Sequence, residues 1–93
     1  MSRLRIGVIG AGMISQVEHI PNILRLADLF ELVGVADPSA TARSFIGQRY
    51  GIATSDNAQE LMQAGLDAVL IAAPDFWHAE LVLRALSFGL HVF

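Results

Sequence analysis

The stretch Ile6-Gly7-Val8-Ile9-Gly10-Ala11-Gly12-Met13-Ile14-Ser15 places three glycines in an otherwise apolar run near the start of a 93-residue chain. Residues 3–9 become continuously apolar in their second half, which is typical of a strand buried on both faces. From Met13 onward, apolar residues recur at spacings of three or four, which predicts an amphipathic helix. The segment from Gly10 to Gly12 is therefore predicted to be the turn that joins a strand to a helix.

The glycines at this turn meet a specific physical demand. Gly10 can adopt backbone angles that other residues avoid, and Gly12 has no Cβ to keep a ligand away from the backbone. The free N–H groups at the start of a helix favour an anion. This is the G-x-G-x-x-G pattern of dinucleotide-binding folds, with Ser15 at its third small position. The pattern predicts a pyrophosphate site at Gly10, Ala11 and Gly12, and a tight turn that binds nothing is the alternative.

Strands and helices are predicted to alternate along the rest of the chain. Further strands are expected over residues 32–36, 52–54, 68–73 and 91–93. The connections are expected to be helical, and Pro21 is expected to break or restart the first helix. Aspartates are expected to cap the other three helices at their N-termini. These helices are expected to run from Asp37 to Gly51, from Asp56 to Gln63, and from Asp75 to Gly89. In the last helix, Ala79, Val82, Leu83 and Leu86 are expected to face inward.

Such alternation predicts an α/β fold, a Rossmann-type doubly wound, mainly parallel sheet with helices on both faces. No linker or repeat interrupts it. Because a doubly wound fold usually has a sixth strand, we expect residues 1–93 to be an incomplete N-terminal dinucleotide-binding domain, truncated at the fifth strand, with the substrate domain outside this chain.

Composition argues against several classes of function. The net charge is −3 and the six basic residues, all arginines, are scattered, which argues against nucleic-acid binding. Charged residues interrupt every long apolar run, so no membrane span is expected. The absence of cysteine fits a cytoplasmic location, and the histidines lack the spacing of a metal site. Without lysine, the chain has no amine that could act as a base.

Asp37 ends the second predicted strand, about 20 to 25 residues after the glycine turn, where dinucleotide folds place an acid that binds ribose. Its carboxylate would repel a 2′-phosphate, so NAD is expected over NADP, although Arg43 would partly offset the charge. The alternative is an N-cap before Pro38 that contributes about 1 kcal/mol of helix stability.

Two segments resemble the Gfo/Idh/MocA family of NAD(P)-dependent sugar oxidoreductases. They are IGVIGAGMISQVEHIPNI, residues 6–23, and DAVLIAAPDFWHAELVLRALSFGLHVF, residues 67–93. The second is similar to a family stretch in which a strand ends in Thr-Pro-Asn and a histidine follows three residues later. Ala73 and Asp75 stand here for the Thr and the Asn. The resemblance implies a set of further cofactor-binding positions: Met13, Ile14, Ala73, Pro74, Asp75 and His78.

The resemblance also implies a reaction, the reversible transfer of hydride between nicotinamide and a CH–OH group of a sugar, cyclitol or related substrate. The family lysine lies in a Glu-Lys-Pro turn just after the fifth strand, so no catalytic residue is expected within this chain. A homo-oligomer is expected for the full-length protein. A non-catalytic dinucleotide-binding regulatory module, and a flavin or S-adenosylmethionine domain, are the alternatives. Trp77 is expected to be a packing or rim residue rather than a stacking platform, and His19 and His91 are expected to be structural.

Overall fold

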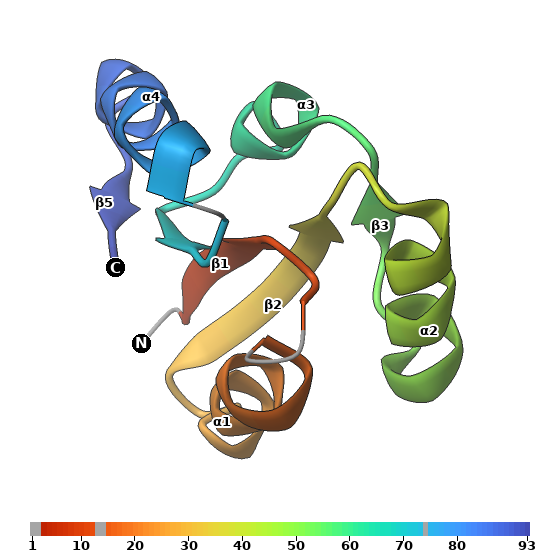
Figure 1. The fold of residues 1–93 in the computed structure, drawn as a ribbon. Helices are drawn as coiled ribbons and strands as arrows, with labels where there is room; N and C mark the ends of the chain where they lie inside the picture. Colours follow the sequence, from red (N-terminus) through yellow and green to blue (C-terminus); the bar gives the residue numbers. More distant parts are fainter. Residues whose placement is uncertain (1–2, 13–14, 74) are drawn as a thin grey trace.

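Five parallel strands form a single sheet in the order β3-β2-β1-β4-β5. The computed structural model describes residues 3–12, 15–73 and 75–93 (Figure 1). The strands are β1 Leu4–Ile9, β2 Phe30–Ala36, β3 Thr54–Ser55, β4 Ala68–Ile71 and β5 His91–Val92. The predicted Rossmann-type parallel sheet is confirmed, and the predicted strand bounds differ from these by at most two residues. Because the chain leaves β1 in one direction and returns to β4 on its other side, the switch point lies between β1 and β4.

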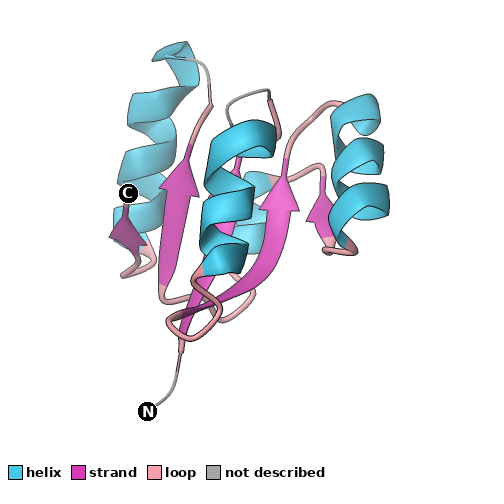
Figure 2. Ribbon diagram, turned by 90° about the horizontal axis from the view of Figure 1, so that it is seen from below, coloured by secondary structure: helices cyan, strands magenta, loops and turns pink. Residues whose placement is uncertain are grey.

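Helical segments cover both faces of the sheet, as a doubly wound fold requires. They are η1 Ser15–His19, α1 Ile20–Arg25, α2 Ala40–Tyr50, α3 Ala58–Met62 and α4 Asp75–Ser87. Figure 1 shows α3 and α4 on one side of the sheet and α1 on the other, and Figure 2 shows α1 in front of the parallel strands. Each face therefore has its own apolar core.

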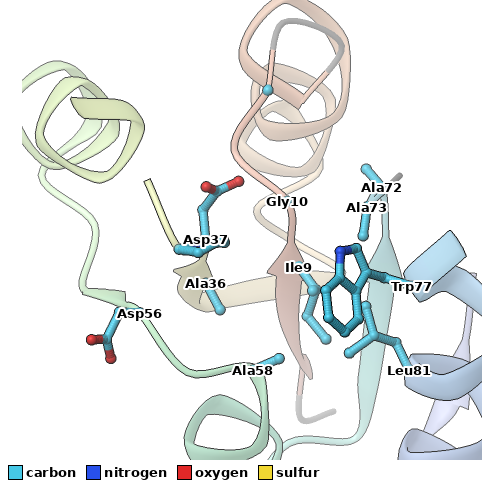
Figure 3. Close-up of a pocket in the computed structure, with 12 residues that line it drawn as sticks. Ile9, Gly10, Ala36, Asp37, Asp56, Ala58, Ala72, Ala73, Trp77 and Leu81 are labelled. Carbon is cyan, nitrogen blue, oxygen red and sulfur yellow. The ribbon is translucent and has the colours of Figure 1, made fainter. Parts of the chain in front are cut away.

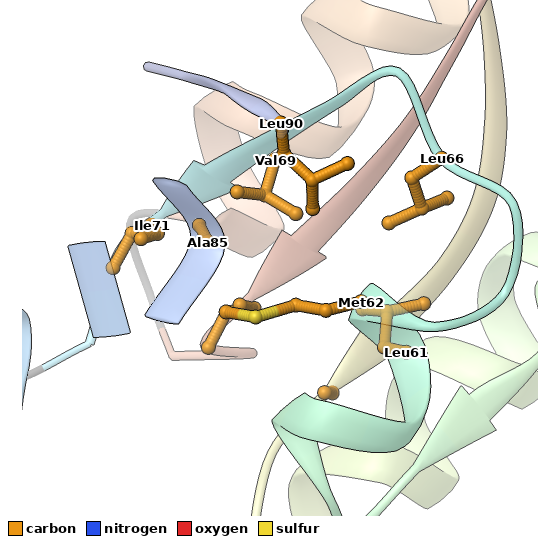
Figure 4. Packing of buried hydrophobic residues seen from close by; sticks show 9 residues of the cluster. Leu61, Met62, Leu66, Val69, Ile71, Ala85 and Leu90 are labelled. Carbon is orange, nitrogen blue, oxygen red and sulfur yellow. The ribbon is translucent and has the colours of Figure 1, made fainter. Parts of the chain in front are cut away.

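The two cores meet through the central strands, whose side chains alternate between the faces. Ile6 and Val8 of β1 pack with Ile20 and Ile46 of α1 and α2. Ile9 packs on the opposite face, in a cluster that α3 and α4 complete (Figure 4). Strands buried on both faces explain the continuous apolar runs in the sequence.

Two of the predicted helix caps are wrong. The cap of α2 is Ser39, whose hydroxyl accepts a hydrogen bond from the Ala42 N–H, and not Asp37. The cap of α3 is Asn57, which accepts from the Glu60 N–H, and not Asp56. In each case a second good capping residue follows the aspartate, and propensity alone does not separate them. The described part of the chain includes the start of α4 at Asp75 but not the Asp75 side chain.

The predicted inward face of α4 is also largely wrong. Leu83 and Leu86 are 69% and 56% exposed, and Ala79 is exposed as well. Val82 contacts the core as predicted, but its companions there are Leu81 and Ala85. Because α4 carries apolar residues on two neighbouring stripes, the periodicity of three and four fits either of them.

Pro21 shapes the helix that follows the glycine turn. The chain remains helical, but the turn before Pro21 is the π-helical η1, and α1 then begins at Ile20. This confirms the predicted restart. In a π turn each carbonyl pairs with the N–H five residues later, so the carbonyl of Gln16 would face Pro21, which has no N–H. The Tyr50 hydroxyl, at the end of α2, donates to that carbonyl over 3.0 Å.

We expect Tyr50→Phe to lower the free energy of unfolding by about 1 to 3 kcal/mol, because it leaves a half-buried carbonyl without a donor. The matched control is Ser44→Ala, which removes an exposed hydroxyl from the same helix and should change stability by less than about 0.5 kcal/mol. Urea denaturation of the full-length protein measures both. Equal stability of the two variants would contradict the role assigned to Tyr50.

Candidate functional site

A cavity of about 660 Å³ opens at the carboxyl ends of the central strands. It lies at the switch point between β1 and β4, where open α/β sheets bind their ligands. Four of the residues predicted to bind a cofactor line it: Gly10, Gly12, Asp37 and Ala73. Figure 3 shows the residues around this cavity, with Asp37 on one side of Gly10 and Trp77 on the other.

Gly10 makes the turn possible because it has no side chain. Its φ is +107°, a left-handed angle that residues with a Cβ rarely adopt. A Cβ there would lie 2.7 Å from the carbonyl oxygen of Ala72, at the end of β4. The Gly10 N–H donates to the Ala36 carbonyl over 2.7 Å, so the turn also stays bonded to the end of β2. The predicted sharp turn at Gly10 is confirmed.

Gly12 is constrained differently. Among the described residues, no atom lies within 4 Å of a Cβ placed at this position, and the residue is exposed. The protein itself therefore does not require a glycine here, in contrast to Gly10. A missing Cβ at such a position leaves the backbone open to close approach by a ligand, as the sequence predicts.

The Asp37 carboxylate is held by two backbone N–H groups. Its Oδ2 accepts from the Ala11 N–H and its Oδ1 from the Ser39 N–H, both over 2.8 Å. The Arg43 guanidinium donates to the carbonyls of Asp37 and Pro38 over 2.8 and 3.0 Å. Arg43 thus stiffens the turn after β2, and Asp37 ties that turn to the glycine turn.

Gln16 holds the glycine turn from its other side, a role that no sequence pattern indicates. Its Nε2 donates to the Ala11 carbonyl over 2.7 Å, and its backbone N–H donates to the Gly12 carbonyl over 3.0 Å. Nearby, Ser15 is fully buried, and its hydroxyl has no hydrogen-bond partner among the described residues. Serine at the third position of the glycine pattern is expected to allow close packing of helix on strand, although less tightly than glycine, and the structure shows this residue buried.

The remaining predicted positions are spread around the site. Ala11 is buried beneath the turn, and His78 is exposed on α4 and is not among the described residues that line the cavity. Met13, Ile14 and Pro74 lie outside the described residues, as does the Asp75 side chain. The roles of all these residues stay predictions. The lining residues that sequence reasoning did not assign to a site are Ile9, Ala36, Pro38, Asp56, Ala58, Ala72, Trp77 and Leu81.

The described residues include neither a membrane-spanning helix nor a cluster of metal-binding side chains. None of the described helices has the length and apolar character needed to cross a membrane. Within the same part of the chain, no group of three or more histidine, aspartate or glutamate side chains is placed to hold a metal ion.

The glycine turn, the acid at the end of β2 and the cavity at the switch point define a dinucleotide-binding Rossmann domain. The Gfo/Idh/MocA model, described as an oxidoreductase family with an NAD-binding Rossmann fold, matches residues 4–93. The chain therefore belongs to the Gfo/Idh/MocA oxidoreductase family.

Individual relatives agree with this assignment. The rhizopine catabolism protein MocA of Rhizobium meliloti is 37% identical over 93 residues, which are 99% of this chain and 28% of the relative. Inositol 2-dehydrogenase 3 of Saccharopolyspora erythraea is 36% identical over 91 residues, 97% of this chain and 27% of the relative. The WlbA dehydrogenase of Bordetella pertussis, solved with NADH and UDP-GlcNAcA, superposes with a TM-score of 0.89 at 27% identity, covering 98% of this chain and 28% of that one. The chain thus spans somewhat more than a quarter of the length of these proteins.

We expect Gly10→Ala to destabilise the protein by at least about 2 kcal/mol, because the new Cβ is strained by the left-handed φ and collides with the Ala72 backbone. The matched control is Gly12→Ala, whose Cβ has free space and should change the free energy of unfolding by less than about 0.5 kcal/mol. Chemical denaturation of the two full-length variants measures the difference. If both variants unfold at the wild-type midpoint, the packing of β1 against β4 described above is wrong.

Proposed function

We propose that this chain is the NAD-binding domain of an oxidoreductase that transfers hydride between nicotinamide and a CH–OH carbon of a sugar, cyclitol or related small molecule. The observation that carries the proposal is the cavity at the switch point, which Gly10, Gly12 and Asp37 line together. Family membership supports the class of reaction. The inositol named for one relative and the UDP-sugar bound to another support the class of substrate.

The residues at the cavity suit the parts of NAD. The open backbone at Gly12 offers N–H groups to the pyrophosphate, and Gly10 keeps the end of β1 free of side chains. The Asp37 carboxylate, fixed by two N–H donors, can accept hydrogen bonds from the adenosine ribose hydroxyls with its remaining lone pairs. Ala73 leaves room at the end of β4. When bound, NAD supplies the hydride acceptor.

The base that removes the hydroxyl proton is proposed to come from outside this chain. No lysine occurs among the 93 residues, and the family lysine implied by the sequence resemblance follows the fifth strand. In this division of roles, the described residues bind and orient the cofactor, and a separate domain supplies the substrate contacts.

The function is tested with the full-length protein, NAD and a panel of cyclitols, free sugars and nucleotide sugars. We expect an increase in absorbance at the NADH wavelength with at least one of these substrates, and Gly12→Ala should raise the KM for NAD because its methyl group occupies the space proposed for the pyrophosphate. Binding of NAD without turnover on any substrate would favour the non-catalytic regulatory module. Absence of NAD binding would contradict the proposal as a whole.

We expect the protein to prefer NAD to NADP because of Asp37. At about 5 Å and an effective dielectric constant near 20, each like charge on a 2′-phosphate costs about 3 kcal/mol, which solvent will reduce. Asp37→Asn removes the negative charge. It also places an amide N–H₂ opposite one of the two backbone N–H donors, so one of the two hydrogen bonds is lost. It should therefore tighten NADP binding by about tenfold or more and weaken NAD binding several-fold.

The matched control is Asp56→Asn, which removes a second carboxylate that lines the same cavity. It lacks the contact with the glycine turn, so it should change the ratio of the two dissociation constants far less. Calorimetric titration with each dinucleotide gives the constants. If wild type binds NADP as tightly as NAD, the role proposed for Asp37 is incorrect.

A further inference from the structure

Trp77 projects from the first turn of α4 into the wall of the cavity. Figure 3 shows its indole between Ala73 and Leu81, beside Ile9. Trp77 is the only tryptophan in the chain. It is 51% exposed although its ring is large and apolar. Its ring centroid lies 5.2 Å from that of Phe76 at an interplanar angle of 46°, and Phe76 is itself 77% exposed. An aromatic face that is open to a cavity is a surface on which a flat ring can lie.

The lining of the cavity differs from one side to the other. Around Trp77 it is apolar, with Leu81, Ile9 and Ala58, whereas Asp37 and Asp56 lie on the far side. Of the chemical groups in a dinucleotide, the diphosphate is charged and the riboses are polar. Only the two bases have flat faces that would gain from contact with indole.

The position of Asp37 decides which base this is. The proposed function places the adenosine ribose at the Asp37 carboxylate, and adenine is attached to that same ribose. Adenine must therefore lie within one sugar's length of Asp37, inside the cavity that Asp37 and Trp77 share. The nicotinamide is separated from this point by the diphosphate and a second ribose.

We infer that Trp77 is a specificity-determining contact for the adenine ring of the cofactor, with its indole face forming one wall of the adenine site. This inference rests on the proposed function. From its position in the sequence, Trp77 is expected to be a packing or rim residue rather than a stacking platform, and its place in the cavity lining favours the stacking role. Contact with a ring face is tolerant of the base's substituents, so the site should select a flat base more strongly than it selects adenine's amino group.

The test compares Trp77→Leu and Trp77→Phe in the full-length protein. The aromatic control is Phe88→Leu, because Phe88 directly follows α4 and is not among the described residues that line the cavity. The probes are NAD, ADP, which lacks the nicotinamide half, and nicotinamide mononucleotide, which lacks the adenine half. Calorimetry gives each dissociation constant, steady-state kinetics give KM for NAD and kcat, and circular dichroism verifies folding.

We expect Trp77→Leu to weaken the binding of NAD and of ADP by the same factor, about 5- to 150-fold, the range for loss of one base-stacking aromatic. Trp77→Phe should recover most of that loss. Nicotinamide mononucleotide binding and kcat at saturating NAD should stay within about twofold of wild type, since the nicotinamide half makes no contact with the indole. The difference between wild-type and Trp77→Phe fluorescence should also show quenching by ADP.

Three results would overturn the inference. The first is a Trp77→Leu variant that binds NAD and ADP as tightly as wild type does, and the second is a Phe88→Leu variant that loses as much affinity as Trp77→Leu. A loss confined to nicotinamide mononucleotide and kcat would place the indole at the other base. In all three cases wild type still binds NAD and the proposed function stands, whereas a wild-type protein that binds no NAD removes both the inference and its foundation.

Discussion

The close approach of β1 to the end of β4 at Gly10 is the constraint on which the site depends. At this residue the backbone of one strand end passes so near the Ala72 carbonyl that even a methyl group has no room. Two strands that are distant in the sequence can therefore end side by side, with nothing but backbone between them. The cavity exists because the turn takes up no side-chain volume at this point, and the flanking alanines at Ala36, Ala72 and Ala73 extend the same open space.

A chain of hydrogen bonds then fixes the direction of the glycine turn. The Ala11 N–H donates to Asp37 at the end of β2, and the Ala11 carbonyl accepts from Gln16 at the start of the helix. The Gln16 carbonyl, in turn, accepts from Tyr50 at the end of α2. The peptide groups around Ala11 are thus held from both sides by segments that belong to the β2–α2 unit or to the helix itself. Such a turn is preorganised, so a ligand that binds it does not have to supply the free energy of ordering it.

Sequence reasoning was sufficient for the framework and for the glycine turn, and it failed where two local solutions have similar energies. The alternation of buried strands with helices determines a parallel sheet, and Gly10 has no competing interpretation once a strand ends at Ile9. By contrast, Asp37 and Ser39 are equally good caps, and the choice depends on the Ala11 N–H, a group 26 residues away. The inward face of α4 was predicted wrongly for the same reason, because the packing partners that decide it are far away in the sequence.

The charges of the molecule bear on the proposed binding of a dinucleotide by an acidic chain. Arg5 pairs with Glu31 at the amino ends of the strands, Arg84 pairs with Glu80 on α4, and Arg43 binds backbone carbonyls. Among the described residues that line the cavity, none is a cation and two are aspartates. The proposed site for a diphosphate therefore relies on backbone N–H groups among the described residues, and their attraction falls off within a turn of the helix. A 2′-phosphate placed beside Asp37, as in NADP, would gain none of that attraction. It would also meet a carboxylate whose position is fixed by two N–H donors.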